Sequence, residues 1–479
     1  MSRLHGLLLL ALFALPAAAQ YDHLTIVPDS LASALAPVCA RVESRGLSDT
    51  TVSVSDVLAS STGRDDQERI RNFIKRAYSE WGTTYVLLAG DNEQIPCRRC
   101  WVELTPQYKD SIPTELYYSA LDGDWDGDGD GQFGEAEDSV DLIPDVLLGR
   151  LPLATPAEME AFADRFIAYT GDSTKPYLEN ALFAGFDINA QYREEDNCEL
   201  LDSLLRPPSV RSFKVYDSHS GNHEDSVKHL LNRGMNIWLQ YDHCAYNTMG
   251  CGWLNHNWFL LWGELDDMTN APDYTINVAA GCFPSAFDSS YCVAEVLLTA
   301  PAGGCVATFG STRLTWGTDP DPFRTGTHFY CEKTLEGFWQ GPGNGSFAGL
   351  VTGQTQAAPL VPGNVVWRWC HYEFMLAGEP SMPVWVPAGT GVVEREKREV
   401  RRVKDGATVV RGVLFLPEAR GEKRESRSEL LDITGRKMLD LHHGGDDVSA
   451  LAPGVYFVRA EPSAASRQPS AVTRVVVTR

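Results

Sequence analysis

Residues 274–285 read Tyr-Thr-Ile-Asn-Val-Ala-Ala-Gly-Cys-Phe-Pro-Ser, an apolar run that carries Cys282 just beyond its carboxyl end. A matching stretch at residues 235–244 reads Met-Asn-Ile-Trp-Leu-Gln-Tyr-Asp-His-Cys, and its apolar run leads to His243. Both runs are typical of buried strands. In open α/β sheets, reactive side chains collect beyond the carboxyl ends of parallel strands, so two neighbouring strands would bring Cys282 and His243 together.

A cysteine and a histidine at such an edge have the chemistry of a nucleophilic pair. The thiolate is the nucleophilic form of cysteine, and a nearby imidazolium lowers a cysteine pKa from about 8.5 to roughly 4 to 7. The pattern also has a purely structural interpretation. Cysteine is among the most often buried residue types, and a histidine at a strand end is often only a hydrogen-bond donor.

Strand-like and helix-like segments alternate along the chain. This alternation predicts an α/β fold with a largely parallel sheet flanked by helices. Thr155-Pro-Ala-Glu158 has the form of a capping box with proline at the first helical position. The expected helices are residues 65–81, the segment after Thr155, and residues 225–233; the expected strands are residues 85–89, 139–149, 181–186 and 305–309.

Length and composition limit the classes of protein. A chain of 479 residues exceeds what one hydrophobic core usually serves, so two or three domains are expected. The hydrophobic content of 43% argues for a folded protein. The formal net charge of -23 argues against a general nucleic-acid binder, because phosphate contacts require a basic surface.

Residues 1–19 have the pattern of a secretory signal peptide. A short basic start is followed by an apolar core and by Ala17-Ala18-Ala19. No later run approaches the roughly 18 apolar residues of a membrane span, so we expect an exported protein without a transmembrane segment. Its eleven cysteines are then compatible with five disulfides and one free thiol. For Cys97-Arg-Arg-Cys100, a local disulfide or unpaired thiols are favoured over a zinc or redox pair.

The acidic stretch between Asp122 and Asp138 predicts a calcium loop. Calcium takes six to eight oxygen ligands, and alternating acidic residues and glycines allow a tight loop to wrap the ion. Two EF-hand-like registers fit, and the one beginning at Asp126 is preferred because it places Gly131 at the sharp turn. A solvated acidic turn is the alternative, but so many carboxylates would repel one another without a cation. The candidate ligands are Asp124, Asp126, Asp128, Asp130, Glu135 and Glu137.

The composition changes near Val393. A charged segment, residues 394–404, is followed by short β-branched runs separated by turns, which predicts a small all-β sandwich behind a charged linker. The runs are residues 408–415, 430–434, 455–459 and 472–477. This part of the chain carries no recognisable catalytic set.

Several motifs between Tyr85 and Val386 together resemble those of the gingipain-type cysteine peptidases, whose caspase-like (flavodoxin-like) fold is an α/β sheet. Besides the segments ending at His243 and Cys282, with Phe283 and Phe287-Asp288 after the cysteine, they are Leu87-Leu-Ala-Gly-Asp91, Tyr117-Tyr-Ser-Ala-Leu-Asp-Gly-Asp-Trp125, Pro144-Asp-Val-Leu-Leu-Gly-Arg-Leu-Pro152 and Leu376-Ala-Gly-Glu-Pro-Ser381.

The resemblance implies hydrolysis of protein or peptide substrates through an acyl-enzyme, with Cys282 as nucleophile and His243 as acid and base. Backbone amides at Cys282 and Cys244 would form the oxyanion hole. The family usually has glycine directly after the histidine, so Cys244 would distort the hole if that position needs a positive φ. Asp187, beyond the strand at residues 181–186, is a candidate to orient the imidazole, although a surface carboxylate fits equally well.

The last 50 or so residues resemble the C-terminal sorting domain of bacterial type IX secretion cargo. The motifs are Leu431-Asp-Ile-Thr-Gly-Arg436, Leu451-Ala-Pro-Gly-Val-Tyr-Phe-Val458 and Arg474-Val-Val-Val477. This implies the type IX secretion machinery as a partner and a secreted or surface-attached protein; an ordinary β-sandwich adhesion module is the alternative.

These observations predict a secreted cysteine endopeptidase stabilised by structural calcium, or a catalytically inactive relative that acts as a secreted or cell-surface binding protein. The expected organisation is a signal peptide (1–19), an N-terminal α/β subdomain with the calcium loop (20–170), a catalytic caspase-like subdomain (171–388), and a linker with the β-sandwich sorting domain (389–479).

Overall fold

The computed structural model describes most of the first 386 residues and seven strands near the carboxyl terminus. Two compact units are present, residues 1–390 and 391–479, and each is described by itself. The predicted signal peptide and the whole of the predicted charged linker lie outside the described residues. The described ranges are 20–138, 140, 142–189, 193–289, 291–317, 326–340, 346–347, 365–386, 408–410, 413–416, 428–432, 437–441, 444–447, 454–460 and 472–477.

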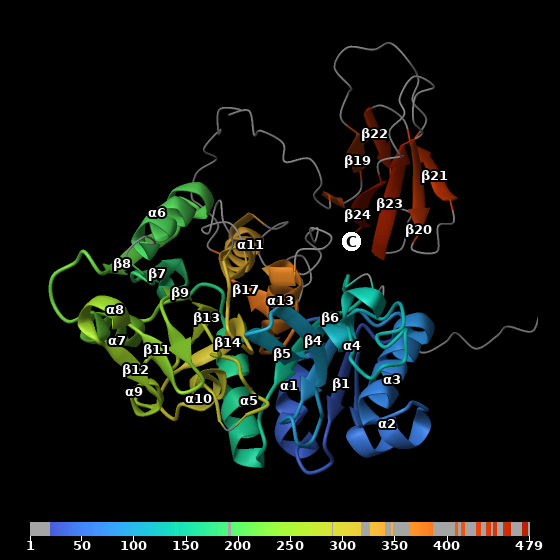
Figure 1. Ribbon diagram of the computed structural model, residues 1–479, viewed down its shortest axis with the longest axis horizontal. Coiled ribbons are helices and arrows are strands. Elements are labelled where there is room, and N and C mark those ends of the chain that lie inside the picture. The colour runs from blue at the N-terminus through green and yellow to red at the C-terminus, as the bar shows by residue number, and fades with distance from the viewer. Residues whose placement is uncertain are drawn as a thin grey trace, which may run out of the picture. The chain divides into compact units, whose positions relative to one another are not determined.

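The first unit is built on a ten-stranded sheet with the order β2-β1-β3-β6-β16-β14-β13-β9-β7-β8. Figure 1 labels β1, β6, β14, β13, β9, β7 and β8 of this sheet. Neighbouring strands are parallel throughout, except where β14 meets β16. The sheet therefore consists of two parallel halves that run in opposite directions, and the predicted largely parallel α/β architecture is confirmed. The strands are β1 (His23–Val27), β2 (Asp49–Ser53), β3 (Tyr85–Ala89), β6 (Leu147–Leu151), β7 (Asn180–Gly185), β8 (Arg211–Tyr216), β9 (Ile237–Tyr241), β13 (Thr275–Ala280), β14 (Cys305–Ser311) and β16 (Phe374–Ala377).

Strand β16 joins the two halves although it comes late in the chain. Ala377 pairs with Arg150 of β6 on one side and with Thr308 of β14 on the other. All four residues of β16 are buried. One continuous sheet thus runs through both predicted subdomains, and the connection depends on a four-residue strand whose sequence carries no periodic signal.

Alternate side chains of the strands enter cores on opposite faces of the sheet. A single core extends along one face and includes residues of α1 (Ala32–Ser44), α5 (Pro156–Gly171), α6 (Glu194–Leu205) and α11 (Thr327–Gln340). On the other face, α2 (Val54–Ser60), α3 (Asp66–Trp81) and α13 (Val365–Glu373) contribute to the core of the first half, whereas α7 (His223–Asn232) contributes to that of the second.

Helix ends follow their sequence signals. Asp65 caps α3 by accepting from the Glu68 amide, and Gly82 ends that helix with a φ of 77°. The predicted capping box at Thr155 is present at the start of α5. These local hydrogen bonds satisfy amides that a helix end leaves without partners.

The strand predicted at residues 139–149 begins later than expected, at Leu147. Pro144 has no amide hydrogen to donate to a ladder. The Asp145 carboxylate accepts from the Leu121 amide at 2.7 Å, which ties this segment to a turn instead of a strand.

In the second unit, five of the seven described strands overlap the predicted β-branched runs, whereas the strands at residues 437–441 and 444–447 lie outside them. A five-stranded sheet has the order β18-β24-β23-β20-β21, and β19 pairs with β22. The sandwich itself and its role in sorting stay predictions. The strands are β18 (Thr408–Val410), β19 (Val413–Leu416), β20 (Ser428–Asp432), β21 (Lys437–Leu441), β22 (Gly444–Asp447), β23 (Gly454–Ala460) and β24 (Val472–Val477).

All eleven cysteines lie in the described ranges, and each is a free thiol, so the disulfides considered from the sequence are not formed in this structure. Cys97 and Cys100 show why a short spacing in the sequence is not enough for two cysteines to form a disulfide. Cys97 packs into the core on one face of the sheet and Cys100 into the core on the other. Within the described residues, no helix is both long and apolar enough to span a membrane.

Candidate active site

Cys282 and His243 each lie just beyond the carboxyl end of one of two neighbouring strands. Strands β9 and β13 are parallel, and Tyr241 pairs with Ala280. Each candidate residue lies two positions beyond this last pair. Because paired strands are about 4.8 Å apart, the register brings both residues to the same edge of the sheet.

Two further polar residues continue this row. Gly185 of β7 pairs with Tyr241 on one side and with Tyr216 of β8 on the other. Asp187 follows β7, and Asp217 follows β8 directly. The carboxyl ends of four adjacent strands therefore present Cys282, His243, Asp187 and Asp217 in this order along the edge.

The His243 imidazole is half-buried and held on two sides. Its Nε2 lies 2.9 Å from the backbone oxygen of Ile188, and its ring packs edge-on against Trp253 at a centroid distance of 4.7 Å. A carbonyl oxygen only accepts hydrogen bonds, so Nε2 carries the proton. In the neutral ring, Nδ1 then has the lone pair that can act as a base.

Asp187, proposed from the sequence to orient the imidazole, has other partners. Its Oδ2 accepts from the Asn255 side chain at 3.1 Å, and its amide donates to Asp217 at 2.7 Å. The observed contact to His243 comes from the carbonyl of the next residue, Ile188. A backbone carbonyl leaves no residue-type signal in a sequence, so this contact was not predicted.

Asp242 fixes the loop that follows His243. Its buried carboxylate accepts from the amides of His243 (2.5 Å), Gly252 (2.7 Å) and Trp253 (3.1 Å). Burial raises the pKa of Asp242 to about 6, although these three hydrogen bonds favour the charged form. One feature of the sequence could have indicated this role, namely an acidic residue directly before the histidine at a strand end.

The Cys282 thiol is half-buried and contacts Thr315. The Thr315 amide donates to Sγ at 3.4 Å, and the Thr315 hydroxyl lies 3.6 Å from the same atom. Burial raises the pKa of Cys282, the two Thr315 contacts lower it, and the buried carboxyl of Glu373 raises it further. The resting Cys282 side chain is thus a thiol, and this pKa shift is opposite in direction to the lowering expected for a cysteine beside an imidazolium.

The turn after Cys282 has a strained residue that is firmly held. Phe283 has a φ of 66°, which is unfavourable for a residue with a side chain. Its amide donates to the backbone oxygen of Arg313 at 3.0 Å. The Arg313 guanidinium in turn forms two bonds to the Asp288 carboxylate, at 2.8 and 2.7 Å, and Arg99 also contacts Asp288. Residues from the hairpin strand β4 (Arg98–Thr105) and from beyond β14 therefore support this turn.

Cys244 does not have the positive φ that would have distorted the predicted oxyanion hole. Among the described residues, positive φ values at non-glycine positions occur at Leu142, Asn257 and Phe283, and not at Cys244. The Cys244 sulfur instead packs beside Gly281. A Cβ at position 281 would lie 2.4 Å from this sulfur, so the glycine before Cys282 makes room for the Cys244 side chain.

The acidic loop brings together three carboxylates of the preferred register. Oxygen atoms of Asp126, Asp128 and Asp130 lie within 4.8 Å of one another. Gly131, at the predicted sharp turn, has a φ of 85°, and its amide donates to Asp126 Oδ1 at 2.9 Å. This arrangement fits the first three ligand positions of an EF-hand-like loop.

Positive charge and backbone amides partly compensate the negative charge of this loop. Arg64 donates to Asp126 at 2.7 Å and to Asp124 at 3.3 Å. The Asp138 carboxylate accepts from the amides of Gly127 (2.6 Å) and Gly134 (2.8 Å) and so closes the loop. Partial burial and repulsion from the neighbouring carboxylates raise the pKa of Glu135, the signature of an acidic cluster that a cation would relieve.

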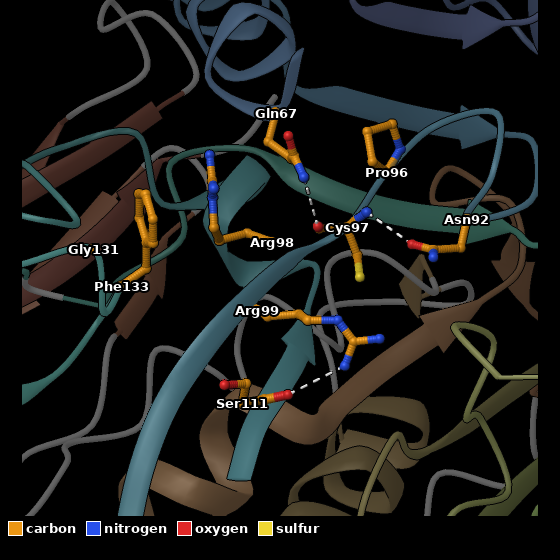
Figure 2. Close-up of a pocket in the computed structure, with 9 residues that line it drawn as sticks. All are labelled: Gln67, Asn92, Pro96, Cys97, Arg98, Arg99, Ser111, Gly131 and Phe133. Atoms are coloured by element: carbon orange, nitrogen blue, oxygen red, sulfur yellow. Dashed lines mark hydrogen bonds between the residues drawn. The ribbon is translucent and has the colours of Figure 1, made fainter. Parts of the chain in front are cut away.

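A cavity of about 360 Å³ is lined by neither Cys282 nor His243. Cys97 lines it together with Arg99 and Ser111, and Arg99 donates to the Ser111 backbone oxygen at 3.5 Å (Figure 2). Burial raises the pKa of Cys97 to about 12, so this thiol stays protonated. The cavity therefore holds no activated nucleophile among the residues that line it.

The sequence model of Peptidase family C25 matches residues 17–385. No curated protein matches the chain. Among solved structures, the chain is similar to the Arg specific cysteine proteinase gingipain R (RgpB), at 16% identity over 96% of this chain and 98% of that one, with a TM-score of 0.59. The complex of Porphyromonas gingivalis RgpB pro- and mature domains matches at 16% identity over 95% and 100%, with a TM-score of 0.58. At this identity, the structural likeness concerns the fold.

Proposed function

The chain belongs to peptidase family C25, which identifies it as a cysteine peptidase, and from this premise we propose that it is a secreted endopeptidase with Cys282 as nucleophile and His243 as acid and base. The observation that carries the assignment is the pairing of Tyr241 with Ala280, two residues before His243 and Cys282 respectively. Secretion rests on the sequence pattern of residues 1–19.

In the proposed reaction, Cys282 Sγ attacks the carbonyl carbon of the scissile bond. His243 Nδ1 takes the thiol proton during the attack, because burial keeps the resting group a thiol. The same proton passes to the leaving amine, and a thioester remains on Cys282. Water then attacks the thioester with His243 as the base, which releases the carboxylic acid and restores the thiol.

The developing oxyanion needs donors near the scissile carbonyl. We assign this role to the backbone amides of Cys282 and Cys244, where one such donor is worth roughly 3 to 4 kcal/mol. The amide is independent of side-chain identity, and Cys244 has no positive φ. Cysteine at position 244 is therefore compatible with the role.

The test uses full-length protein and a library of fluorogenic peptides. We expect turnover by the wild type, and loss of turnover in Cys282→Ala and in His243→Ala. The double variant should be little worse than either, because the two groups act as one unit. Cys39→Ala, a half-buried thiol of α1, is the matched control. A folded wild type without turnover would support the inactive binding protein instead.

Calcium is proposed as a structural ligand of the acidic loop. Asp126, Asp128 and Asp130 supply carboxylate oxygens, and Asp124, Glu135 and Glu137 are the further candidates. When bound, the ion neutralises their repulsion and orders the loop. We assign it no step in peptide hydrolysis.

The carboxyl-terminal unit is proposed to direct the protein through the type IX secretion machinery to the outside of the cell or to its surface. The support is the strand pattern from Thr408 to Val477 and the motif resemblance. Export of a fluorescent fusion by a type IX secreting host, and its loss when residues 391–479 are removed, would test the proposal.

A further inference from the structure

A compact group of two histidines and one aspartate lies beside the candidate active site. Asp217 follows β8, His223 begins α7, and His256 ends the short helix α8 (Trp253–His256). One ligand atom from each lies within 4.8 Å of the other two. Segments separated along the chain therefore converge on one point, and none of these residues has a role in the proposed hydrolysis.

The ring of His223 is oriented so that its lone pair points into this group. The side chain is buried, and Nε2 lies 2.9 Å from the backbone oxygen of His219. Because a carbonyl only accepts, Nε2 is protonated and Nδ1 is the acceptor in the neutral ring. Nδ1 has no hydrogen-bond partner among the described residues and lies 3.8 Å from Asp217 Oδ1.

The Asp217 carboxylate is oriented in the same way. Its Oδ2 accepts from the Asp187 amide at 2.7 Å and from the Asn255 side chain at 3.2 Å. Its buried Oδ1 lies 3.2 Å from His256 Nε2 and makes no well-formed hydrogen bond to a described residue. In metal sites, a ligand side chain typically forms hydrogen bonds through one polar atom and leaves its other polar atom available to the metal.

Glycine keeps the space between these atoms open. A Cβ at Gly252 would lie 2.9 Å from Asp217 Oδ1 and 3.3 Å from His223 Nδ1. The Trp258 ring stacks on the His256 ring at a centroid distance of 4.5 Å. The three donor atoms thus lie close together, with Gly252 and the Trp258 ring packed against the group.

We propose that His223 Nδ1, His256 Nε2 and Asp217 Oδ1 bind one divalent transition-metal ion, with zinc as the best fit. Zinc accepts nitrogen and carboxylate oxygen ligands at about 2.0 to 2.2 Å, which puts tetrahedral ligand atoms roughly 3.3 Å apart. The separations of 3.2 and 3.8 Å bracket this value. A water molecule would complete the four-coordinate site.

The metal would also act on the neighbouring loop. It would anchor α8, whose first residue, Trp253, packs on His243. An effect of this anchoring on His243 as acid and base rests on the proposed function. The metal site itself does not.

The experiment measures metal binding directly. Full-length protein is stripped with chelator, returned to calcium, and titrated with cobalt chloride and, separately, with zinc chloride. We expect one bound equivalent and visible absorption typical of tetrahedral cobalt. The sulfur-to-cobalt charge-transfer band should be absent, because the site has no thiolate among its ligands.

His256→Ala should weaken cobalt and zinc binding at least tenfold. This side chain is about a third exposed, so the variant is expected to fold. His229→Ala, which removes an exposed histidine of α7, is the matched control and should bind like the wild type. Zinc should raise the melting temperature of the wild type and the control but not of His256→Ala.

Three outcomes would overturn the proposal. They are a wild type that takes up no stoichiometric cobalt or zinc, a His256→Ala variant that binds as tightly as the wild type, and a thiolate charge-transfer band. In the first case, the group is a histidine and aspartate ion pair. None of these readouts depends on peptide hydrolysis, so they stay distinct from a failure of the proposed function.

Discussion

The backbone amide of Thr315 donates to Cys282 Sγ across 3.4 Å, and it links the residue beyond β13 to the segment beyond β14. This contact favours the thiolate, but burial outweighs it and raises the pKa of Cys282. The raised pKa therefore predicts that the resting Cys282 thiol reacts slowly with alkylating reagents near neutral pH.

We expect alkylation of Cys282 to accelerate with pH and to keep rising above about pH 8.5, the usual cysteine value. Thr315→Val removes the hydroxyl and keeps the amide, so it should raise the pKa further and slow alkylation several-fold near neutral pH. Peptide mapping after timed iodoacetamide treatment measures both rates. A plateau of fast alkylation below pH 7 would instead indicate a preformed thiolate and imidazolium pair.

Cys244→Gly should leave kcat within a few-fold, because the backbone at position 244 has no positive φ and the amide is retained. The variant should lose about 1 kcal/mol of unfolding free energy, since glycine is costly in the strand pair β10 (Cys244–Ala245) and β11 (Thr248–Gly250). Cys244→Ala separates loss of the thiol from backbone freedom. A tenfold rise of kcat in the glycine variant alone would show that cysteine distorts the oxyanion hole.

Removal of calcium should lower the melting temperature. At a calcium concentration of 100 times Kd, the bound ion stabilises the fold by about 2.7 kcal/mol. Asp128→Asn should reduce this effect, and Asp164→Asn, an exposed aspartate of α5, should not. Differential scanning calorimetry with and without chelator, together with elemental analysis, checks the prediction. Identical melting curves and no bound calcium would contradict it.

His23 should make stability depend on pH in the alkaline range. Burial alone would lower its pKa, but hydrogen bonds with Asp49 (2.7 Å) and Glu379 (2.8 Å) raise it to about 9. A raised histidine pKa contributes stability that is complete below about pH 6.5 and is lost as the pH rises through 9. The rise of the His23 pKa from 6.5 to about 9 corresponds to roughly 3 kcal/mol of stability.

Urea unfolding of wild type and His23→Gln between pH 6 and 10 tests the His23 contribution. The difference in unfolding free energy between the two proteins should narrow by roughly 3 kcal/mol between pH 6 and 10. His219→Gln, which changes an exposed histidine, should show no such trend. A constant difference would mean that His23 is not charged in the folded state.

Asp288→Asn should destabilise the protein and impair turnover. The carboxylate is nearly fully buried between Arg313 and Arg99, and removing one partner of such a group costs about 3 kcal/mol or more. Because the Arg313 backbone holds the Phe283 amide, the turn after Cys282 should loosen and kcat should fall. Arg99→Lys, at the more exposed partner, is the milder comparison. Unfolding curves and kcat measured together would reveal a purely structural role if only stability changed.

The sequence determined the local elements and the identity of the two candidate reactive residues. Apolar runs of strand length indicated that His243 and Cys282 lie at strand ends. The capping residues Asp65 and Thr155 mark the starts of two helices. These features depend on neighbours within a few residues, so the chain alone was sufficient. Alternating acids and glycines likewise placed Asp126, Asp128 and Asp130 in one loop.

The tertiary structure decided what no local pattern encodes. Strand β16 joins the two halves of the sheet because its two partners lie far away in the sequence. The contact to His243 comes from the Ile188 carbonyl, which any residue type carries. The pKa of Cys282 depends on burial and on Thr315 and Glu373, and the grouping of Asp217, His223 and His256 depends on loop packing. Burial and long-range contacts exist only in the folded chain, so neither the pKa of Cys282 nor the grouping of these three side chains could be predicted from the sequence.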